Sequence, residues 1–122
     1  MDPVYDRQKL AEIYAMADAG CVPSVFPEGF GLVSLEMQAC GLPVLATDAG
    51  GLKETYIDGQ TGFYVKQNDS RDLAEKIRTV ILNTDLRSQM AKNARQYTVQ
   101  NCSWEVTADK LIRIYEAVLN HE

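Results

Sequence analysis

Residues 23–36 read PSVFPEGFGLVSLE, and this stretch decides how the rest of the chain is interpreted. It follows a short apolar run at residues 20–22 and leads into an apolar series that predicts a helix beginning near Leu32. A strand, a glycine-containing turn and a helix N-terminus together form an anion site, because the first N–H groups of a helix have no partner within it. Gly29 and Gly31 leave that backbone open to a ligand.

Two carboxylates, Glu28 and Glu36, stand on either side of this anion site with seven residues between them. A carboxylate repels phosphate, so we interpret the pair as acceptors of hydrogen bonds from neutral hydroxyls such as those of sugars. A ligand with phosphate in the middle and hydroxyl-rich groups at both ends is a nucleotide sugar. The stretch therefore leads to the hypothesis of a nucleotide-sugar site.

Length and composition describe a soluble globular chain. Its 122 residues form one domain at most, and 46% apolar residues are enough for a core. A net charge of −5 gives no electrostatic attraction to nucleic acid or to an anionic membrane. The start of the chain does not resemble a signal peptide, and no apolar stretch approaches a transmembrane segment in length. Cys21, Cys40 and Cys102 lack metal-ligand spacing, so we expect small buried thiols in a cytoplasmic protein.

Apolar and turn patterns predict an α/β chain. The predicted strands lie at residues 20–24, 43–47 and 63–65. The predicted helices lie at residues 6–17 and about 32–40, with three more beginning after Asn68-Asp69-Ser70, Thr84 and Ser103. A strand, helix and strand within thirty residues form a βαβ unit with parallel strands. Gly50-Gly51 follows the second strand, at the carboxyl edge where open α/β sheets bind ligands.

The last three predicted helices carry apolar residues at helical spacing. We interpret these stripes as core packing, including the one that runs from Trp104 to Leu119. Trp104 follows a predicted cap and is expected to wedge its helix against a neighbour.

Together these residues resemble retaining glycosyltransferases of the family 4 (group 1) type, in the C-terminal part of their donor-binding, Rossmann-like domain. The matching segments occur in the family's order across nearly the whole chain. They are Tyr14–Asp18, Pro23-Ser24, Glu28–Leu32, Leu35-Glu36, Gly41–Val44, Gly50–Glu54, Asp58–Gly62 and Ser103-Trp104. The E-x7-E pair alone, which joins Glu28–Leu32 to Leu35-Glu36, is a weak signal. Counted as one motif, it is one of six that occur in order before Ser103-Trp104, and six in order are a specific signal.

The resemblance implies a partial Rossmann-like α/β domain, with a short parallel sheet of about three strands flanked by helices. This is half of the C-terminal domain of a GT-B fold. Residues 1–122 are expected to be a nucleotide-sugar-binding domain truncated at its N-terminal side. In the family an arginine and a lysine on earlier segments neutralise the diphosphate, and an N-terminal domain binds the acceptor. The expected partners are therefore the nucleotide sugar and the missing N-terminal half of the enzyme, or a partner chain.

The resemblance also implies roles for individual residues. Glu28 would be the catalytic carboxylate that meets hydroxyls of the donor sugar, and Glu36 would bind the ribose hydroxyls. The backbone amides that would contact the donor's sugar and diphosphate are those of Gly29, Phe30, Gly31, Leu32 and Val33. The donor would be a UDP- or GDP-sugar, with no metal and no further cofactor expected. Glu54 is as consistent with a helix-start carboxylate as with a ligand contact.

Two functions from different classes stay open. The first is an enzyme part, a glycosyltransferase fragment that binds the donor for retaining transfer to a glycan, lipid or small molecule. The alternative is a non-catalytic nucleotide-sugar-binding or assembly module that pairs with another chain. A nicotinamide-binding domain is disfavoured because no G-x-G-x-x-G follows a strand. Three strands leave a sheet edge uncovered, which favours homo-oligomers or a partner, and the isolated chain is expected to have little transferase activity.

Overall fold

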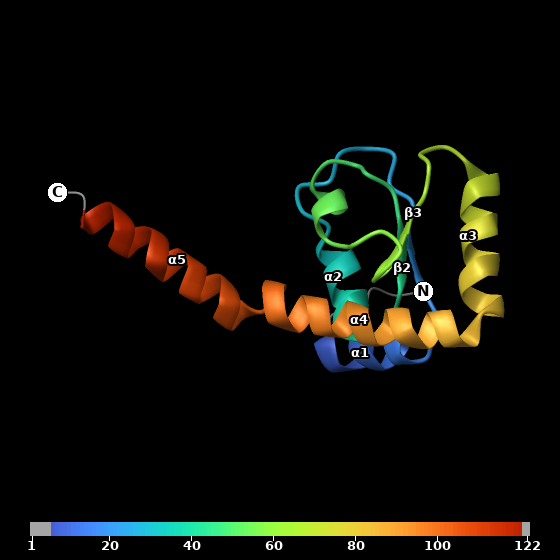
Figure 1. The fold of residues 1–122 in the computed structure, drawn as a ribbon, viewed down its shortest axis with the longest axis horizontal. Helices are drawn as coiled ribbons and strands as arrows, with labels where there is room; N and C mark the ends of the chain where they lie inside the picture. The colour runs from blue at the N-terminus through green and yellow to red at the C-terminus, as the bar shows by residue number, and fades with distance from the viewer. Residues whose placement is uncertain (1–5, 121–122) are drawn as a thin grey trace.

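The computed structural model describes residues 6–120, in which helices flank a small sheet and the last helix projects away from it (Figure 1). In chain order its elements are α1 (Arg7–Ala15), β1 (Gly20–Val22), α2 (Leu32–Ala39), β2 (Val44–Ala46), the 3-10 helix η1 (Gly51–Glu54), β3 (Gly62–Tyr64), α3 (Ser70–Leu82), α4 (Thr84–Cys102) and α5 (Trp104–Leu119). The three strands form a parallel sheet in the order β1-β2-β3. The predicted strands and the βαβ unit are confirmed.

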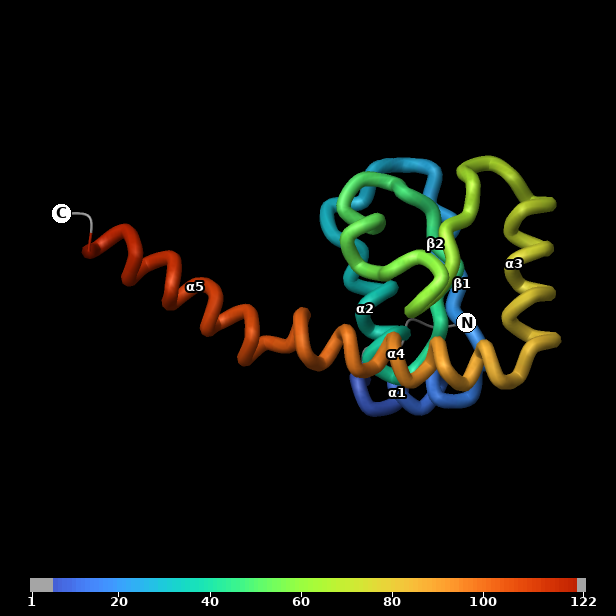
Figure 2. The backbone as a smooth tube through the Cα atoms, in the orientation of Figure 1, coloured from blue at the N-terminus to red at the C-terminus, as the bar shows by residue number. Residues whose placement is uncertain are grey.

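Helices cover both faces of this sheet, with α2 on one side and α3 on the other (Figures 1 and 2). The middle strand β2 is buried along its whole length. On the α2 side it packs with Val22, Leu52 and Tyr56, and on the α3 side Leu45 packs with Val65 and Val80. Two apolar clusters on opposite faces are what a buried parallel strand requires.

Side-chain caps set where the helices begin. Asp69 accepts hydrogen bonds from the first turn of α3, and Ser103 accepts one from Val106 in α5, as predicted. The cap of α4 is Asn83, and the prediction of Thr84 was wrong by one residue. The Asn83 amide oxygen accepts the Leu86 N–H at 3.0 Å, so Thr84 becomes the first helical residue.

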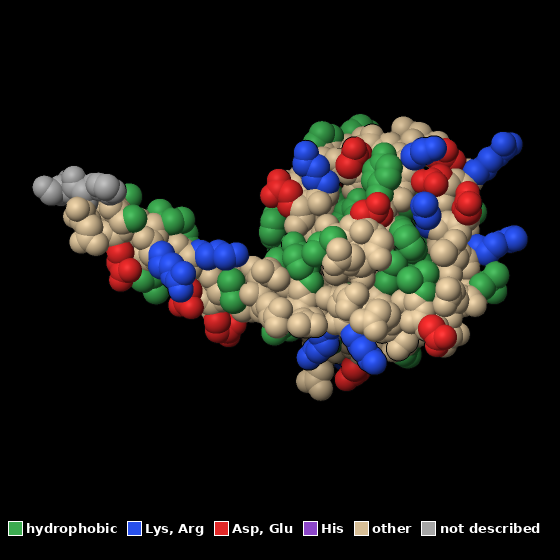
Figure 3. All heavy atoms as spheres, in the orientation of Figure 1, with side chains coloured by type: hydrophobic (Ala, Val, Ile, Leu, Met, Phe, Trp, Pro, Cys, Tyr) green, Lys and Arg blue, Asp and Glu red, His purple; other side chains and the backbone are tan. Residues whose placement is uncertain are grey.

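The helix α5 does not pack on the core, contrary to the prediction from its apolar stripe. It leaves the body after Ser103, whose backbone is extended, and none of its residues is buried. Trp104 is 80% exposed and therefore wedges no helix against another. In the space-filling view apolar side chains are visible along this projecting segment (Figure 3). The apolar periodicity correctly predicts a helix, but nothing within residues 6–120 covers its apolar face.

Cys21 also departs from the prediction, because its thiol is exposed while Cys40 and Cys102 are partly buried. Cys21 is the middle residue of β1, and β1 is an edge strand with an open side. Its pairing partner Leu45 is buried in the central strand. The open edge agrees with the uncovered sheet that the sequence predicts, while self-association stays a prediction. None of the helices in residues 6–120 is long and apolar enough to cross a membrane.

Candidate functional site

The glycine-containing loop after β1 is tied directly to the loop after β2, at the carboxyl edge of the sheet. The Glu28 N–H donates to the Ala49 carbonyl at 3.2 Å, and the Gly51 N–H donates to the Glu28 carbonyl at 2.8 Å. A Cβ on Gly50 would lie 2.5 Å from the Glu28 carbonyl oxygen, and one on Gly51 would collide with the Gly29 carbonyl. The paired glycines therefore allow the two loops to join through their backbones.

The Glu28 carboxylate is half-buried and held from its own loop. The Ser24 hydroxyl donates to Glu28 Oε1. The Ser24 carbonyl in turn accepts a 2.6 Å hydrogen bond from the Thr47 hydroxyl, which follows β2. Among residues 6–120 the second carboxylate oxygen, Oε2, has no hydrogen-bond partner, so it can accept one from a ligand.

Five successive backbone N–H groups, from Gly29 to Val33, have no acceptor within the described part of the chain. The helix α2 starts from Gly31, whose φ of +86° is left-handed and whose lack of a side chain leaves the first turn uncapped. The internal bonds of the helix begin only with Ser34, whose N–H lies 3.1 Å from the Gly31 carbonyl. Open donors at the positive end of the helix dipole attract an anion.

Glu36 lies one helical turn beyond Leu32, and both side chains are exposed. Residues four apart share one face of a helix, so the carboxylate stands on the same face as the exposed first turn. Glu36 is also close to Tyr14 of α1. The pKa of the Tyr14 hydroxyl is raised above its usual value, mainly by burial and additionally by the negative charge of Glu36. The structure thus gives Glu28 a place before the open amides and Glu36 a place after them.

Glu54 and Phe30 complete the set that the sequence singled out. Glu54 ends η1 with its side chain exposed, and the Tyr97 hydroxyl donates to its backbone carbonyl at 3.2 Å. The structure gives the Glu54 carboxylate itself no partner within residues 6–120. The Phe30 side chain is 46% exposed beside the open amides.

A buried polar network beneath this loop was not predicted from the sequence. Gln38 Nε2 donates to the Thr55 carbonyl at 2.7 Å, and the hydroxyls of Thr55 and Ser34 are 2.8 Å apart. All three side chains are fully buried. A signal was available, because Ser34 and Gln38 are polar residues four apart in a helix that is apolar apart from them and Glu36.

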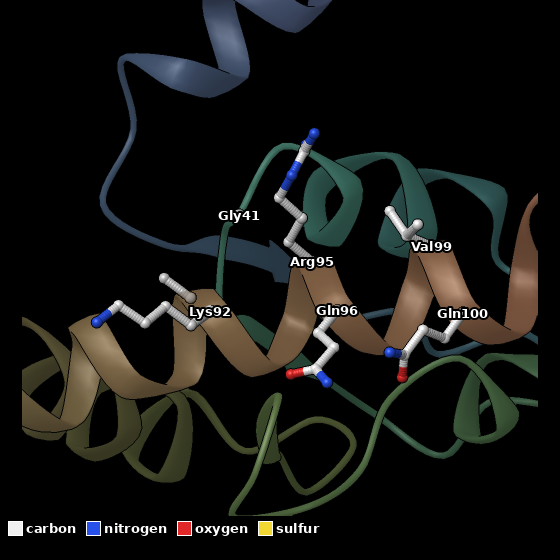
Figure 4. Close-up of a pocket in the computed structure, with 7 residues that line it drawn as sticks. Gly41, Lys92, Arg95, Gln96, Val99 and Gln100 are labelled. Atoms are coloured by element: carbon white, nitrogen blue, oxygen red, sulfur yellow. The ribbon is translucent and has the colours of Figure 1, made fainter.

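Two hollows lie on the surface of residues 6–120, and the smaller of the two adjoins these loops. The smaller, about 280 Å³, is lined by residues that follow all three strands, including Val25, Thr47 and Lys66. The larger, about 540 Å³, runs along α4 beside Gly41, where Arg95 and Val99 project (Figure 4). Gly41 lies between the end of α2 and the start of β2, so the larger hollow is at the other end of the sheet from Glu28. Within residues 6–120 no three His, Cys, Asp or Glu side chains gather as metal ligands.

Comparison with known proteins identifies the class to which this fold and loop arrangement belong. Residues 4–97 match the family described as glycosyl transferases group 1, and the chain belongs to that family. Solved structures with the same fold are GT-B glycosyltransferases. Among these, sucrose-phosphate synthase from Thermosynechococcus elongatus has a TM-score of 0.87 and 32% identity, over 99% of this chain and 30% of that one.

Particular relatives extend the likeness. HepE of Anabaena, solved in complex with UDP and glucose, gives a TM-score of 0.80 at 30% identity over 87% of this chain and 29% of its own. A D-inositol 3-phosphate glycosyltransferase from Geodermatophilus obscurus is 44% identical over 94% of this chain and 24% of its own. The same activity is named for a relative from Saccharomonospora viridis that is 38% identical over 96% of this chain and 27% of its own. The chain therefore spans about a quarter of the length of the curated relatives it matches.

Proposed function

We propose that the chain binds the sugar and diphosphate of a nucleotide-sugar donor, as part of a retaining glycosyltransferase. The observation that carries the proposal is the row of five unpartnered N–H groups at residues 29–33, with an acceptor-only carboxylate on each side. Amides suit a diphosphate, and carboxylates suit the hydroxyls of a sugar and a ribose. The likeness to HepE, a structure solved with UDP and glucose, supports a donor of this kind.

The amides of Leu32 and Val33, at the start of α2, would stabilise the departing diphosphate. When the anomeric C–O bond breaks, negative charge grows on the leaving phosphate oxygens, and donors already in place lower the energy of that transition state. Gly29, Phe30 and Gly31 would lie against the sugar, with Leu32 and Val33 against the diphosphate.

The two carboxylates would orient the ends of the donor. Glu28, held by Ser24, would accept sugar hydroxyls and support the positive charge that develops at the anomeric carbon. Glu36 would accept the two ribose hydroxyls. The donor needs no metal in this scheme, since amides and side chains supply all the contacts.

The acceptor site and the side chains that neutralise the diphosphate would belong to other parts of the enzyme. We place the whole enzyme in the cytoplasm. The isolated chain should therefore bind donor weakly and transfer sugar slowly or not at all. Its retaining stereochemistry would be decided by the assembled enzyme.

Titration of the 15N-labelled chain with UDP-glucose and GDP-mannose, followed through its amide signals, tests the proposal. We expect saturable shifts confined to residues 29–33 and their neighbours, because a phosphate oxygen that accepts an N–H hydrogen bond moves that amide signal. Glu36→Ala should weaken the affinity about tenfold or more, since a hydrogen bond to a charged group contributes about 1.5–3 kcal/mol.

Glu75→Ala is the matched control, because Glu75 is an exposed carboxylate on α3, across the sheet from α2. It removes the same charge and should leave donor affinity unchanged. If neither nucleotide sugar shifts residues 29–33, or both variants bind alike, the proposal is wrong. The assembly-module alternative would then gain support from a stable oligomer seen by sedimentation.

A further inference from the structure

We propose that Gln38, together with Ser34 and Thr55, positions the donor site by fixing how α2 lies against η1. The inference rests on the proposed function, and it adds residues that do not touch the ligand. Through these side chains the orientation of α2, which carries the open amides of Leu32 and Val33 as well as Glu36, depends on the loop that also holds Glu28.

The network joins two residues of α2, one helical turn apart, to Thr55, the C-cap residue of η1. In the first turn of α2, the Ser34 hydroxyl lies 2.8 Å from the Thr55 hydroxyl. One turn further along, Gln38 Nε2 donates to the Thr55 carbonyl at 2.7 Å. Both contacts converge on Thr55, and Gln38 Nε2 also lies 3.2 Å from the Ser34 hydroxyl oxygen, so the three buried side chains hold this part of α2 against the end of η1.

η1 in turn packs against the glycine-containing loop and is hydrogen-bonded to it. Leu52, in η1, packs closely against Gly31: a Cβ added to Gly31 would lie 2.8 Å from Leu52 Cδ1. The Gly51 N–H donates to the Glu28 carbonyl at 2.8 Å. Thr55 is the C-cap residue that follows η1, and its hydroxyl also lies 2.7 Å from the Leu52 carbonyl. A displacement of α2 relative to η1 therefore changes the geometry between the N–H groups of residues 31–33 and the Glu28 carboxylate.

The amide of Gln38 is only half satisfied. Its Nε2 makes the bond to Thr55, whereas its Oε1 is buried and has no partner in the described chain. An unpartnered buried acceptor costs stability, so a glutamine here is a poor choice for stability alone. Gln38→Met removes the unpartnered oxygen and the useful N–H together, and it keeps the side chain's length. Removing the unpartnered oxygen should raise the free energy of unfolding and removing the N–H bond should lower it, so these two effects oppose each other. The contact that orients α2, from Gln38 to the Thr55 carbonyl, is lost in either case.

Four variants separate positioning from stability, with the affinity for UDP-glucose and the melting temperature measured on each. Gln38→Met and Thr55→Val should weaken affinity about three- to tenfold, and Gln38→Met should melt within about 4 °C of wild type. Thr55→Ser keeps the hydroxyl but loses a buried methyl, so it should melt lower and still bind like wild type. Val80→Ala, on the opposite face of the sheet, should also melt lower with affinity unchanged.

The ligand-free amide spectra give a second measurement. Gln38→Met should move the signals of residues 31–33 at the start of α2, and Val80→Ala should not. The inference is overturned if affinity follows melting temperature across the four variants, or if Gln38→Met binds like wild type with unmoved signals. If the wild type binds no nucleotide sugar, the proposed function fails, and the ligand-free spectra still decide whether Gln38 orients α2.

Discussion

Gly31→Ala tests whether the start of α2 is shaped by its backbone and by its contact with η1. Gly31 has a φ of +86°, a left-handed conformation in which a side chain strains the backbone. An added Cβ would also lie 2.8 Å from Leu52 Cδ1 and 3.3 Å from Leu52 Cα. Because one of those atoms is backbone and Leu52 is fully buried, the clash cannot be relieved by a side-chain rotation alone.

The expected loss follows from these two costs. A left-handed residue with a Cβ costs about 1–2 kcal/mol, and overpacking a well-packed site costs about 1–3 kcal/mol. Alanine also makes the unfolded chain less flexible, which offsets about 0.4–1 kcal/mol. We therefore expect Gly31→Ala to lower the free energy of unfolding by about 2–4 kcal/mol. Urea denaturation should show this as a midpoint about 1–3 M lower.

Two other glycines serve as controls. Gly59 is left-handed at +74° with no atom within 4 Å of an added Cβ, so Gly59→Ala should lose only about 1 kcal/mol. Gly29 has neither a left-handed φ nor a neighbour, so Gly29→Ala should stay within about 0.5 kcal/mol of wild type. If Gly31→Ala is no worse than Gly59→Ala, the contact with Leu52 does not restrict the site. If it equals Gly29→Ala, the whole account of the loop is wrong.

Two further predictions concern the core and the projecting helix. Tyr56 donates to the Ala46 carbonyl at 3.0 Å, and its pKa is raised from 10.0 to about 12 by burial, then by Asp58, Asp48 and Tyr64. The folded state therefore holds this proton more tightly than the unfolded state does. At neutral pH the free energy of unfolding of wild type should exceed that of Tyr56→Phe by about 1 kcal/mol. Urea titrations should show this difference shrinking as the pH rises from 10 to 12. Trp104→Ala should change the free energy of unfolding by less than about 0.5 kcal/mol because the ring is 80% exposed, whereas Met90→Ala should lose about 2–5 kcal/mol. A large loss in Trp104→Ala would mean that α5 packs on the body.

The sequence predicted what depends on local chemistry. Strand β2 was recognised because a short apolar run between turn residues is typical of a strand buried on both faces. The start of α2 was recognised because glycines precede an apolar series, and the structure places it at Leu32. The roles predicted for Glu28, Glu36 and the amides between them stay predictions.

What the sequence did not predict depends on contacts between distant segments. The apolar stripe of α5 predicts an amphipathic helix, but it does not tell which surface, if any, buries the apolar face. Cys21 has an apolar neighbourhood in sequence and an open edge in space. The bond from Gln38 to Thr55 joins residues seventeen positions apart, and no periodic pattern encodes such a pairing.

Charge explains why the open amides at the start of α2 would have to provide most of this chain's contacts to a diphosphate. The chain carries a net charge of −5, so its overall field opposes an anionic ligand. In the described residues no Lys or Arg side chain forms an ion pair or hydrogen bond with residues 24–36; Arg87 pairs with Asp18 and Arg95 donates to the Ala39 carbonyl. Short-range, directed N–H groups can still select phosphate within that field, but they do not cancel its charge. Under the proposed function, the cations that neutralise the diphosphate must come from outside this loop, and the loop's own task is to fix the order of sugar, diphosphate and ribose.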